Sequence, residues 1–118
     1  RQIMLSNYSG KCAISGIDIS DFLVASHIVP WSKNEKERLN PENGICLSSL
    51  YDKAYDKGYI GISTKHEVLL SKSLTDNSEK DFFSIFFSNL KGSKIQLPER
   101  FLPRKEFLEY HLDIIFRG

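Results

Sequence analysis

The segment Val24–Gly58 decides the fold, and it reads VASHIVPWSKNEKERLNPENGICLSSLYDKAYDKG. It begins with an apolar run that carries His27 near its end, and Pro30 stops this run because proline has no amide hydrogen for a strand ladder. A polar stretch with two turn signals follows, and a short apolar run then leads into a helical pattern. The predicted order is a strand ending in histidine, a long loop containing an asparagine, a short strand, and a helix with two aspartates.

The helical pattern runs from Ser48 to Gly58, with a serine to cap its start and the glycine to end it. Asp52 and Asp56 stand four residues apart, so they lie one above the other on the same helix face. Like charges at this spacing destabilise a helix by roughly 0.2–0.5 kcal/mol, and a shared cation would relieve that repulsion. The buried side of the helix is expected to be Leu50, Ala54 and Tyr55.

The residues before this segment predict a short helix and a pair of strands. Residues 2–9 carry enough apolar side chains for a helix, which Gly10 would stop. Residues 11–29 are interpreted as two short strands around a turn at residues 16–21. In the second strand, alternation places His27 on the face opposite Ser26.

The residues after the segment predict a hairpin followed mainly by helices. YIGIS (residues 59–63) and EVLLS (residues 67–71) form the hairpin, with its turn near residues 64–66. Ser78 is expected to cap a phenylalanine-rich helix that reaches about Asn89, and SKIQL (residues 93–97) is expected to form a brief strand. Pro103 would open a last helix. Its predicted core contacts are Phe107, Leu108, Leu112, Ile115 and Phe116.

Composition narrows the class of protein. The length of 118 residues fits one domain, and a hydrophobic content of 41% is enough for a core without disulfides. The two cysteines exclude a four-cysteine zinc site and leave a disulfide or two buried thiols, of which we favour the thiols. No apolar run reaches membrane-spanning length, and no signal peptide is visible. A net charge of +1 does not by itself indicate a nucleic-acid binder.

Each polar feature of the segment has a plain structural interpretation. A histidine near a strand end is usually a half-buried structural residue, Asn-Gly is usually a turn, and paired aspartates are usually solvated. Together, however, they supply what cleavage of a phosphodiester needs, namely a base to deprotonate water and a cation to neutralise charge. His27 suits the base, and the carboxylates of Asp52 and Asp56 suit Mg²⁺ or Mn²⁺.

The order and spacing of these motifs resemble the HNH nuclease family, whose core is the ββα-metal motif. HIVP matches its first motif, NPENG its second and LYDKAYDKG its third. The resemblance implies that His27 is the general base, that Asn43 braces the loop carrying the base, and that Asp52 and Asp56 are metal ligands. The run from residue 25 to residue 60, with the flanking KCAISG, IQLP and EYH, is similar to the branch found at the end of bacterial restriction-type endonucleases.

Two positions depart from the family pattern. Many HNH enzymes carry aspartate or histidine just before the base, where this chain has Ser26, and Asp52 replaces the histidine of the third motif. Both changes favour an oxygen-rich Mg²⁺ or Mn²⁺ site over zinc or nickel. The resemblance implies an α+β fold. Its ββα-metal core covers about residues 11–62, with an added hairpin, flanking helices and a C-terminal helical extension over about residues 78–117.

Further residues are candidates for contacts with DNA or with the site. His111 is interpreted as structural, with the alternative that it faces the site, and His66 as an exposed turn residue. The phenylalanine-rich stretch at residues 81–87 is expected to be core or a dimer face. The candidate nucleic-acid contacts are Trp31, Lys33, Arg38, Lys53 and Lys57.

The leading functional hypothesis is a metal-dependent DNA endonuclease domain that hydrolyses phosphodiester bonds as the cleavage module of a restriction or defence protein. It implies DNA as partner, a recognition domain elsewhere in a longer bacterial cytoplasmic protein that starts before Arg1, no membrane contact, and a homodimer for double-strand cutting. The alternative is a catalytically impaired HNH-fold module that binds nucleic acid. A third hypothesis is an enzyme acting on RNA or a free nucleotide, and a purely structural module explains least.

Overall fold

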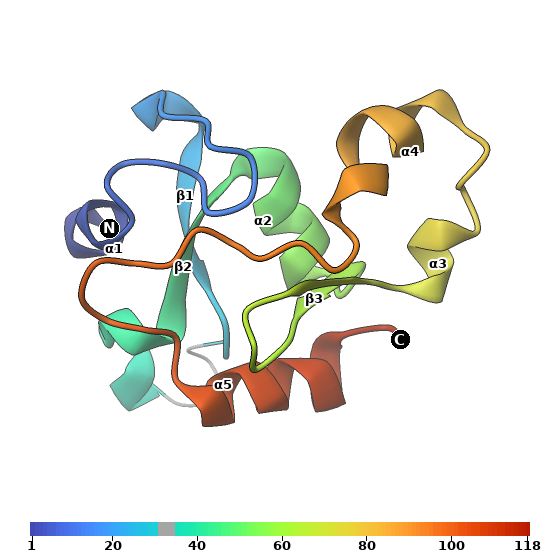
Figure 1. Cartoon of the computed structure of the whole chain (residues 1–118). Coiled ribbons are helices and arrows are strands. Elements are labelled where there is room, and N and C mark those ends of the chain that lie inside the picture. The colour runs from blue at the N-terminus through green and yellow to red at the C-terminus, as the bar shows by residue number, and fades with distance from the viewer. Residues whose placement is uncertain (31–34) are drawn as a thin grey trace.

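The computed structural model describes residues 1–30 and 35–118, and it has the predicted α+β fold (Figure 1). The candidate contacts Trp31 and Lys33 lie outside the described residues. At the centre, strand β1 (Leu23–His27) pairs antiparallel with β2 (Gly44–Ser48), so that His27 lies opposite Gly44. Helix α2 (Ser49–Asp56) follows β2 directly. This strand, loop, strand and helix order is the one predicted from the sequence.

The buried side of α2 differs from the prediction. Tyr51, Ala54 and Tyr55 are buried, whereas Leu50 is 43% exposed. The i, i+3, i+4 spacing of the three buried residues forms one stripe, and Leu50 lies outside it. The helix is capped by Ser48 without a side-chain hydrogen bond, and it ends before Gly58, whose φ of +81° favours glycine.

The first of the two strands predicted before β1 does not form. Helix α1 (Gln2–Asn7) is present as predicted, but residues 11–19 form turns and extended backbone without a strand. A turn explains the difference, since the amide of Gly16 bonds back to the carbonyl of Cys12 at 2.9 Å. This loop gives β2 one hydrogen bond, from Ala13 to Cys46. Burial along β1 also fails to alternate, since Leu23 and Ser26 are its buried residues.

The C-terminal half keeps the predicted hairpin but breaks up the predicted long helix. Strands β3 (Ile60–Ile62) and β4 (Val68–Leu70) pair antiparallel. Helix α3 (Lys72–Thr75) follows the hairpin. In place of one helix from Ser78 to about Asn89, the structure has α4 (Asp81–Phe86), capped by Lys80, and a short 3₁₀ turn, Ser88–Leu90.

Burial of aromatic rings explains the shorter α4. Phe83 and Phe87 turn inward, and Phe87 meets the ring of Tyr51 edge-on with centroids 5.9 Å apart. The backbone leaves the helical region at Phe87, where α4 stops. The predicted SKIQL strand is reduced to an isolated bridge between Glu67 and Lys94.

The last helix starts slightly later than predicted and changes character. Helix α5 (Lys105–Tyr110) is capped by Arg104 rather than opened by Pro103, and it continues as a π-helical turn, His111–Ile115. Figure 1 shows this element running beneath α2 and β3. None of the helices in residues 1–30 and 35–118 combines the length and apolar character needed to cross a membrane.

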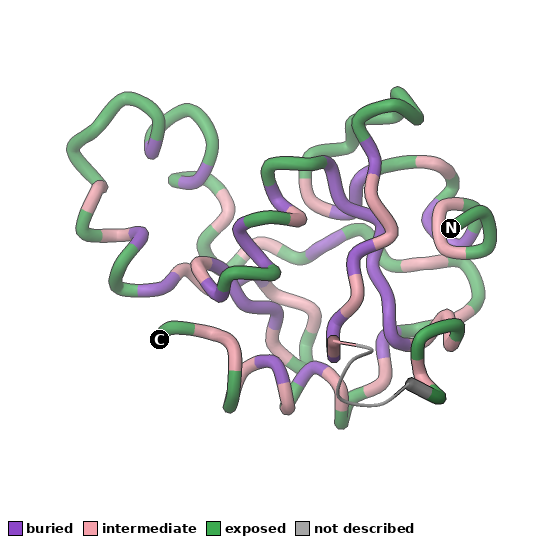
Figure 2. Tube along the Cα trace, turned by 180° about the vertical axis from the view of Figure 1, so that it is seen from behind, coloured by how far each residue is buried: buried purple, intermediate pink, exposed green. Residues whose placement is uncertain are grey.

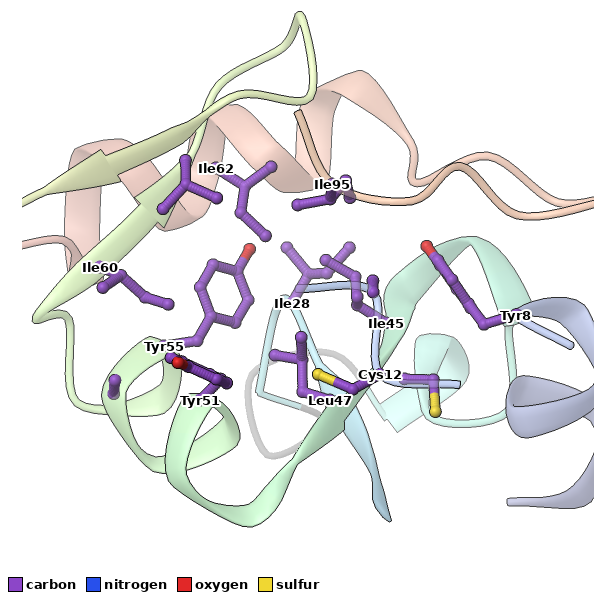
Figure 3. Close-up of a cluster of buried hydrophobic side chains, with 14 of the residues drawn as sticks. Tyr8, Cys12, Ile28, Ile45, Leu47, Tyr51, Tyr55, Ile60, Ile62 and Ile95 are labelled. Atoms are coloured by element: carbon purple, nitrogen blue, oxygen red, sulfur yellow. The ribbon is translucent and has the colours of Figure 1, made fainter. Parts of the chain in front are cut away.

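The core lies between the central strands, α2 and the hairpin. Figure 3 shows the Tyr55 ring among isoleucines that come from β2, β3 and the end of β1. Cys12 and Cys46 are free and buried, as favoured from the sequence, and burial raises the pKa of the Cys46 thiol to about 11. In Figure 2 the segment containing α3 and α4 is mostly exposed, so the buried residues concentrate around the strands that position the site.

Candidate metal and catalytic site

His27 is held at the end of β1 by a backbone carbonyl. Its Nε2 lies 3.0 Å from the carbonyl oxygen of Arg38. A carbonyl only accepts hydrogen bonds, so Nε2 carries the proton and donates. In the neutral ring this leaves Nδ1 with its lone pair, which is the state that a general base needs.

Asn43 joins the two sides of the loop that follows His27. It is fully buried, and its Oδ1 accepts a hydrogen bond from the amide of Val29 at 2.9 Å. Its Nδ2 donates to the carbonyls of Val29 at 3.0 Å and Glu37 at 3.2 Å. Its own carbonyl accepts from the amide of Ile28 at 3.1 Å. The side chain therefore fixes the chain just after His27 against the chain just before the Arg38 carbonyl.

A guanidinium from the C-terminal half clamps the same loop from outside. Arg104 donates to Glu42 through Nη2 at 2.6 Å and Nε at 3.2 Å, and to Glu37 through Nη1 at 3.1 Å. Hydrogen bonding to Glu42 raises the pKa of the Arg104 guanidinium, so this clamp stays charged. Sequence reasoning missed Arg104 because it lies 62 residues from Glu42, and no local spacing links them.

Asp52 and Asp56 of α2 line the same cavity as His27, with a volume of about 310 Å³. Asp52 is half-buried and Asp56 is exposed. Ser26 of β1 and His111 of the π-helical turn line this cavity too. The structure therefore brings together His27, Asp52 and Asp56, the three residues predicted to carry the base and the metal.

His111 is both structural and part of the cavity wall, which combines the two interpretations from the sequence. It is 1% exposed, its Nε2 donates to the carbonyl of Tyr55 at 2.8 Å, and its ring stacks on the Tyr55 ring with centroids 3.8 Å apart. Burial lowers the pKa of His111, while the hydrogen bond to Tyr55 and the charge of Asp56 act in the opposite direction. Its Nδ1 has no hydrogen-bond partner in the described part of the chain.

The cavity suits a hydrated divalent cation. Two carboxylates supply hard oxygen ligands, and two buried polar atoms without partners among the described residues, Ser26 Oγ and His111 Nδ1, belong to residues that line the same cavity. Buried polar atoms of this kind are usually satisfied by water or a ligand. Across residues 1–30 and 35–118, no three histidine, cysteine, aspartate or glutamate side chains are placed to hold one ion directly. Water would therefore complete the coordination of a cation bound by Asp52 and Asp56.

The other predicted contacts lie outside this cavity wall. Arg38 is exposed and contributes its carbonyl to His27. Lys53 lines a separate, largely apolar groove beside Leu74 and Phe87. Lys57 is exposed, and its carbonyl accepts a hydrogen bond from Arg117 Nε at 2.8 Å.

Comparison with known proteins identifies the segment that builds this site. Residues 12–63 match the family model described as HNH endonuclease, and these residues include β1, the loop, β2, α2 and β3. A search of the curated proteins found no match. The matched segment contains His27, Asn43, Asp52 and Asp56. Residues 12–63, the segment that carries these four residues, are therefore similar to the HNH endonuclease family.

Proposed function

We propose that the chain is a divalent-metal-dependent DNA endonuclease domain that hydrolyses phosphodiester bonds. The match of residues 12–63 to the HNH endonuclease family supports nuclease activity. The observation that carries the finer proposal is the shared cavity, whose lining includes the His27 imidazole, with its Nε2 on the Arg38 carbonyl, and two carboxylates. This pairing matches the requirements of metal-assisted hydrolysis, where a base activates water and a cation neutralises the phosphate.

His27 acts as the general base. Its Nδ1 takes the proton of the water that attacks phosphorus. Its Nε2–H stays hydrogen-bonded to the Arg38 carbonyl, whose partial negative charge stabilises the imidazolium that forms. Asn43 acts indirectly, because it holds the Glu37 carbonyl one residue before Arg38. The products implied by the family are a 5′-phosphate and a 3′-hydroxyl.

Asp52 and Asp56 hold the cation, for which Mg²⁺ and Mn²⁺ fit the hard oxygen donors best. A bound cation would neutralise charge on the scissile phosphate and on the leaving oxygen. The two aspartates sit on consecutive turns of α2, so a cation also offsets their mutual repulsion. Ser26 lacks a carboxylate or imidazole, which leaves its place in the wall for water.

The surroundings of the site support DNA as substrate. The long β1–β2 loop carries Lys33 and Arg38, and we assign phosphate contacts to these two side chains and to Lys53 and Lys57. Trp31 is a candidate for stacking on a base or sugar. We further propose that residues 1–118 are one nuclease domain of a longer restriction or defence protein in the bacterial cytoplasm. A second domain would supply sequence recognition, and a homodimer would cut both strands.

The second candidate is an impaired HNH module that binds nucleic acid without cutting it. Ser26 replaces a residue that ligates metal in many relatives, and no three ligand side chains in the described ranges converge on one point. Such a module would retain the fold and the contacts of Arg38. Its binding of nucleic acid would not depend on Asp52 or Asp56.

Plasmid relaxation separates the two candidates. We expect the wild-type protein to nick supercoiled DNA with Mg²⁺ or Mn²⁺ but not with EDTA. The double variant Asp52→Asn, Asp56→Asn should lose this activity, while Asp18→Asn, an exposed aspartate outside the cavity wall, should keep it. Retardation of DNA on a gel without nicking in either metal would instead favour the binding module.

A further inference from the structure

We propose that His111 belongs to the cation site, with its Nδ1 accepting a hydrogen bond from the hydration shell of the cation held by Asp52 and Asp56. The inference rests on the proposed function, because it requires a cation at these aspartates. It extends the site beyond residues 12–63, the segment that matches the family. His111 is a positioning residue in this assignment, since it acts on the cation through water.

The tautomer of His111 is fixed by its hydrogen bond to the Tyr55 carbonyl. The Tyr55 carbonyl accepts from Nε2 of His111 at 2.8 Å and from the amide of Gly58 at 3.1 Å, so it is a saturated acceptor at the C-terminal end of α2. Since a carbonyl cannot donate, Nε2 must carry the proton, and the neutral ring presents Nδ1 as an acceptor. A half-turn of the ring would keep its stacking on Tyr55 but would lose this hydrogen bond, so the bond fixes which nitrogen is which.

The Nδ1 acceptor of His111 is buried. His111 is 1% exposed and its Nδ1 has no partner among residues 1–30 and 35–118, yet its ring lines the same cavity as Asp52 and Asp56. A buried acceptor without a partner is costly, so a donor is expected from the cavity. The aspartates cannot be that donor, because carboxylates only accept when ionised. Water polarised by a cation is a strong donor, and it would satisfy Ser26 Oγ in the same way.

The backbone that carries His111 holds the ring against α2. The chain switches here from α-helix to a π-helical turn, with the amide of Phe116 bonded to the carbonyl of His111 at 2.8 Å. The turn presses against the end of α2, because a Cβ on Gly58 would lie 2.0 Å from the carbonyl oxygen of Ile115. π-Helical turns of this kind are frequent at functional sites. Here the turn fixes the imidazole relative to the helix that carries the aspartates.

Contact through water follows from the placement of the ligands. No three ligand side chains in the described part of the chain can share one ion directly, so Nδ1 is not assigned as an inner ligand. Mg²⁺ retains several waters in protein sites, and these waters need acceptors around them. Outer-shell acceptors of this type commonly change metal affinity by 10- to 100-fold.

The test uses the affinity for Mn²⁺ alone, measured by electron paramagnetic resonance of the wild type and three variants. His111→Phe keeps an aromatic ring on Tyr55 but removes both nitrogens, and we expect it to weaken Mn²⁺ binding about tenfold. Tyr51→Phe is the matched control, because it also removes a side-chain bond to a carbonyl, that of Phe86 at 2.7 Å, on the side of α2 away from the cavity. It should bind Mn²⁺ like the wild type.

Three results distinguish failure of the inference from failure of the proposed function. Wild-type affinity in His111→Phe would overturn the inference alone. If neither the wild type nor Asp52→Asn binds Mn²⁺, both the inference and the proposed function would be overturned. If His111→Phe does not fold, ¹⁵N NMR of wild-type histidines during a Mg²⁺ titration decides. The His111 Nδ1 signal should move upfield while Nε2 stays protonated, and an unmoved Nδ1 would overturn the inference.

Discussion

The residues that orient the base and the helix that carries the carboxylates are held in place by different forces. The loop wall, which we define as residues 35–43 with Val29, supports His27 from outside the cavity lining and is fixed by hydrogen bonds and ion pairs from Asn43 and Arg104. The helix wall, α2, is fixed by burial of Tyr51, Ala54 and Tyr55. Hydrogen bonds are directional and hydrophobic burial is not. The general base His27, which needs a defined orientation, therefore depends on the loop wall. The carboxylates of Asp52 and Asp56, which need only a rigid helix, depend on the helix wall.

The largest effect on stability is expected from breaking the helix wall. Tyr55→Ala should lower the free energy of unfolding by about 3–5 kcal/mol, because it removes a fully buried aromatic ring and the surface on which His111 stacks. Urea denaturation measures this change.

Tyr55→Phe is the matched control for this variant. The Tyr55 hydroxyl has no partner in the ranges that the structure describes, and burial raises its pKa far above the usual value. Its removal should therefore leave stability unchanged or slightly higher. A large loss in Tyr55→Phe would show that the hydroxyl, rather than ring packing, supports α2.

Breaking the loop wall should lower the free energy of unfolding less, but it should disturb the orientation of His27 more. Asn43→Ala should cost about 1–3 kcal/mol, because it leaves the buried amide and carbonyl of Val29 without partners. Hydrogen exchange should show local opening, with the Val29 amide exchanging much faster while the β3–β4 amides keep their protection. An equal loss of protection at the Val29 and β3–β4 amides would contradict the conclusion that the loop wall and the helix wall are held by different forces.

The smallest effect on stability is expected from the outer clamp. Arg104→Met keeps much of the aliphatic stem but removes the guanidinium, which lies over the Phe107 ring and bonds to Glu37 and Glu42. Exposed ion pairs contribute little to folding, so unfolding should change only slightly. DNA cleavage should slow several-fold through kcat.

Lys72→Met is the control for the clamp, because it breaks the exposed ion pair with Asp76 outside the cavity wall. It should leave both stability and cleavage unchanged. Equal effects of the two variants on cleavage would show that the Arg104 clamp does not position the loop.

The sequence predicted the elements whose signals are local. Hydrophobic periodicity, proline and turn residues located β1, β2, α2 and the β3–β4 hairpin. The i, i+4 spacing predicted that Asp52 and Asp56 share one face of the helix, and both line the cavity. The predicted strand over residues 11–15 and the long phenylalanine-rich helix were wrong. In both, tertiary contacts override local pattern: a turn at Cys12–Gly16 breaks the strand, and burial of Phe87 ends α4.

Parts of the site that depend on distant contacts were not predictable from one sequence. Arg104 reaches Glu42 across 62 residues, and the Tyr55 carbonyl meets His111 across 56. Nothing in the spacing of these residues indicates their proximity. The sequence left His111 open between a structural role and the site, and the structure shows one ring serving both the helix end and the cavity wall.

The central claim is that His27 is the base, and its most direct test is cleavage of DNA by His27→Ala with Mg²⁺ or Mn²⁺. We expect cleavage to fall by about 10²–10⁴-fold, to be partly restored by added imidazole, and to leave folding intact. His66→Asn, at a hairpin-turn histidine with φ of +66°, should cleave like the wild type. Undiminished cleavage by His27→Ala would contradict the account.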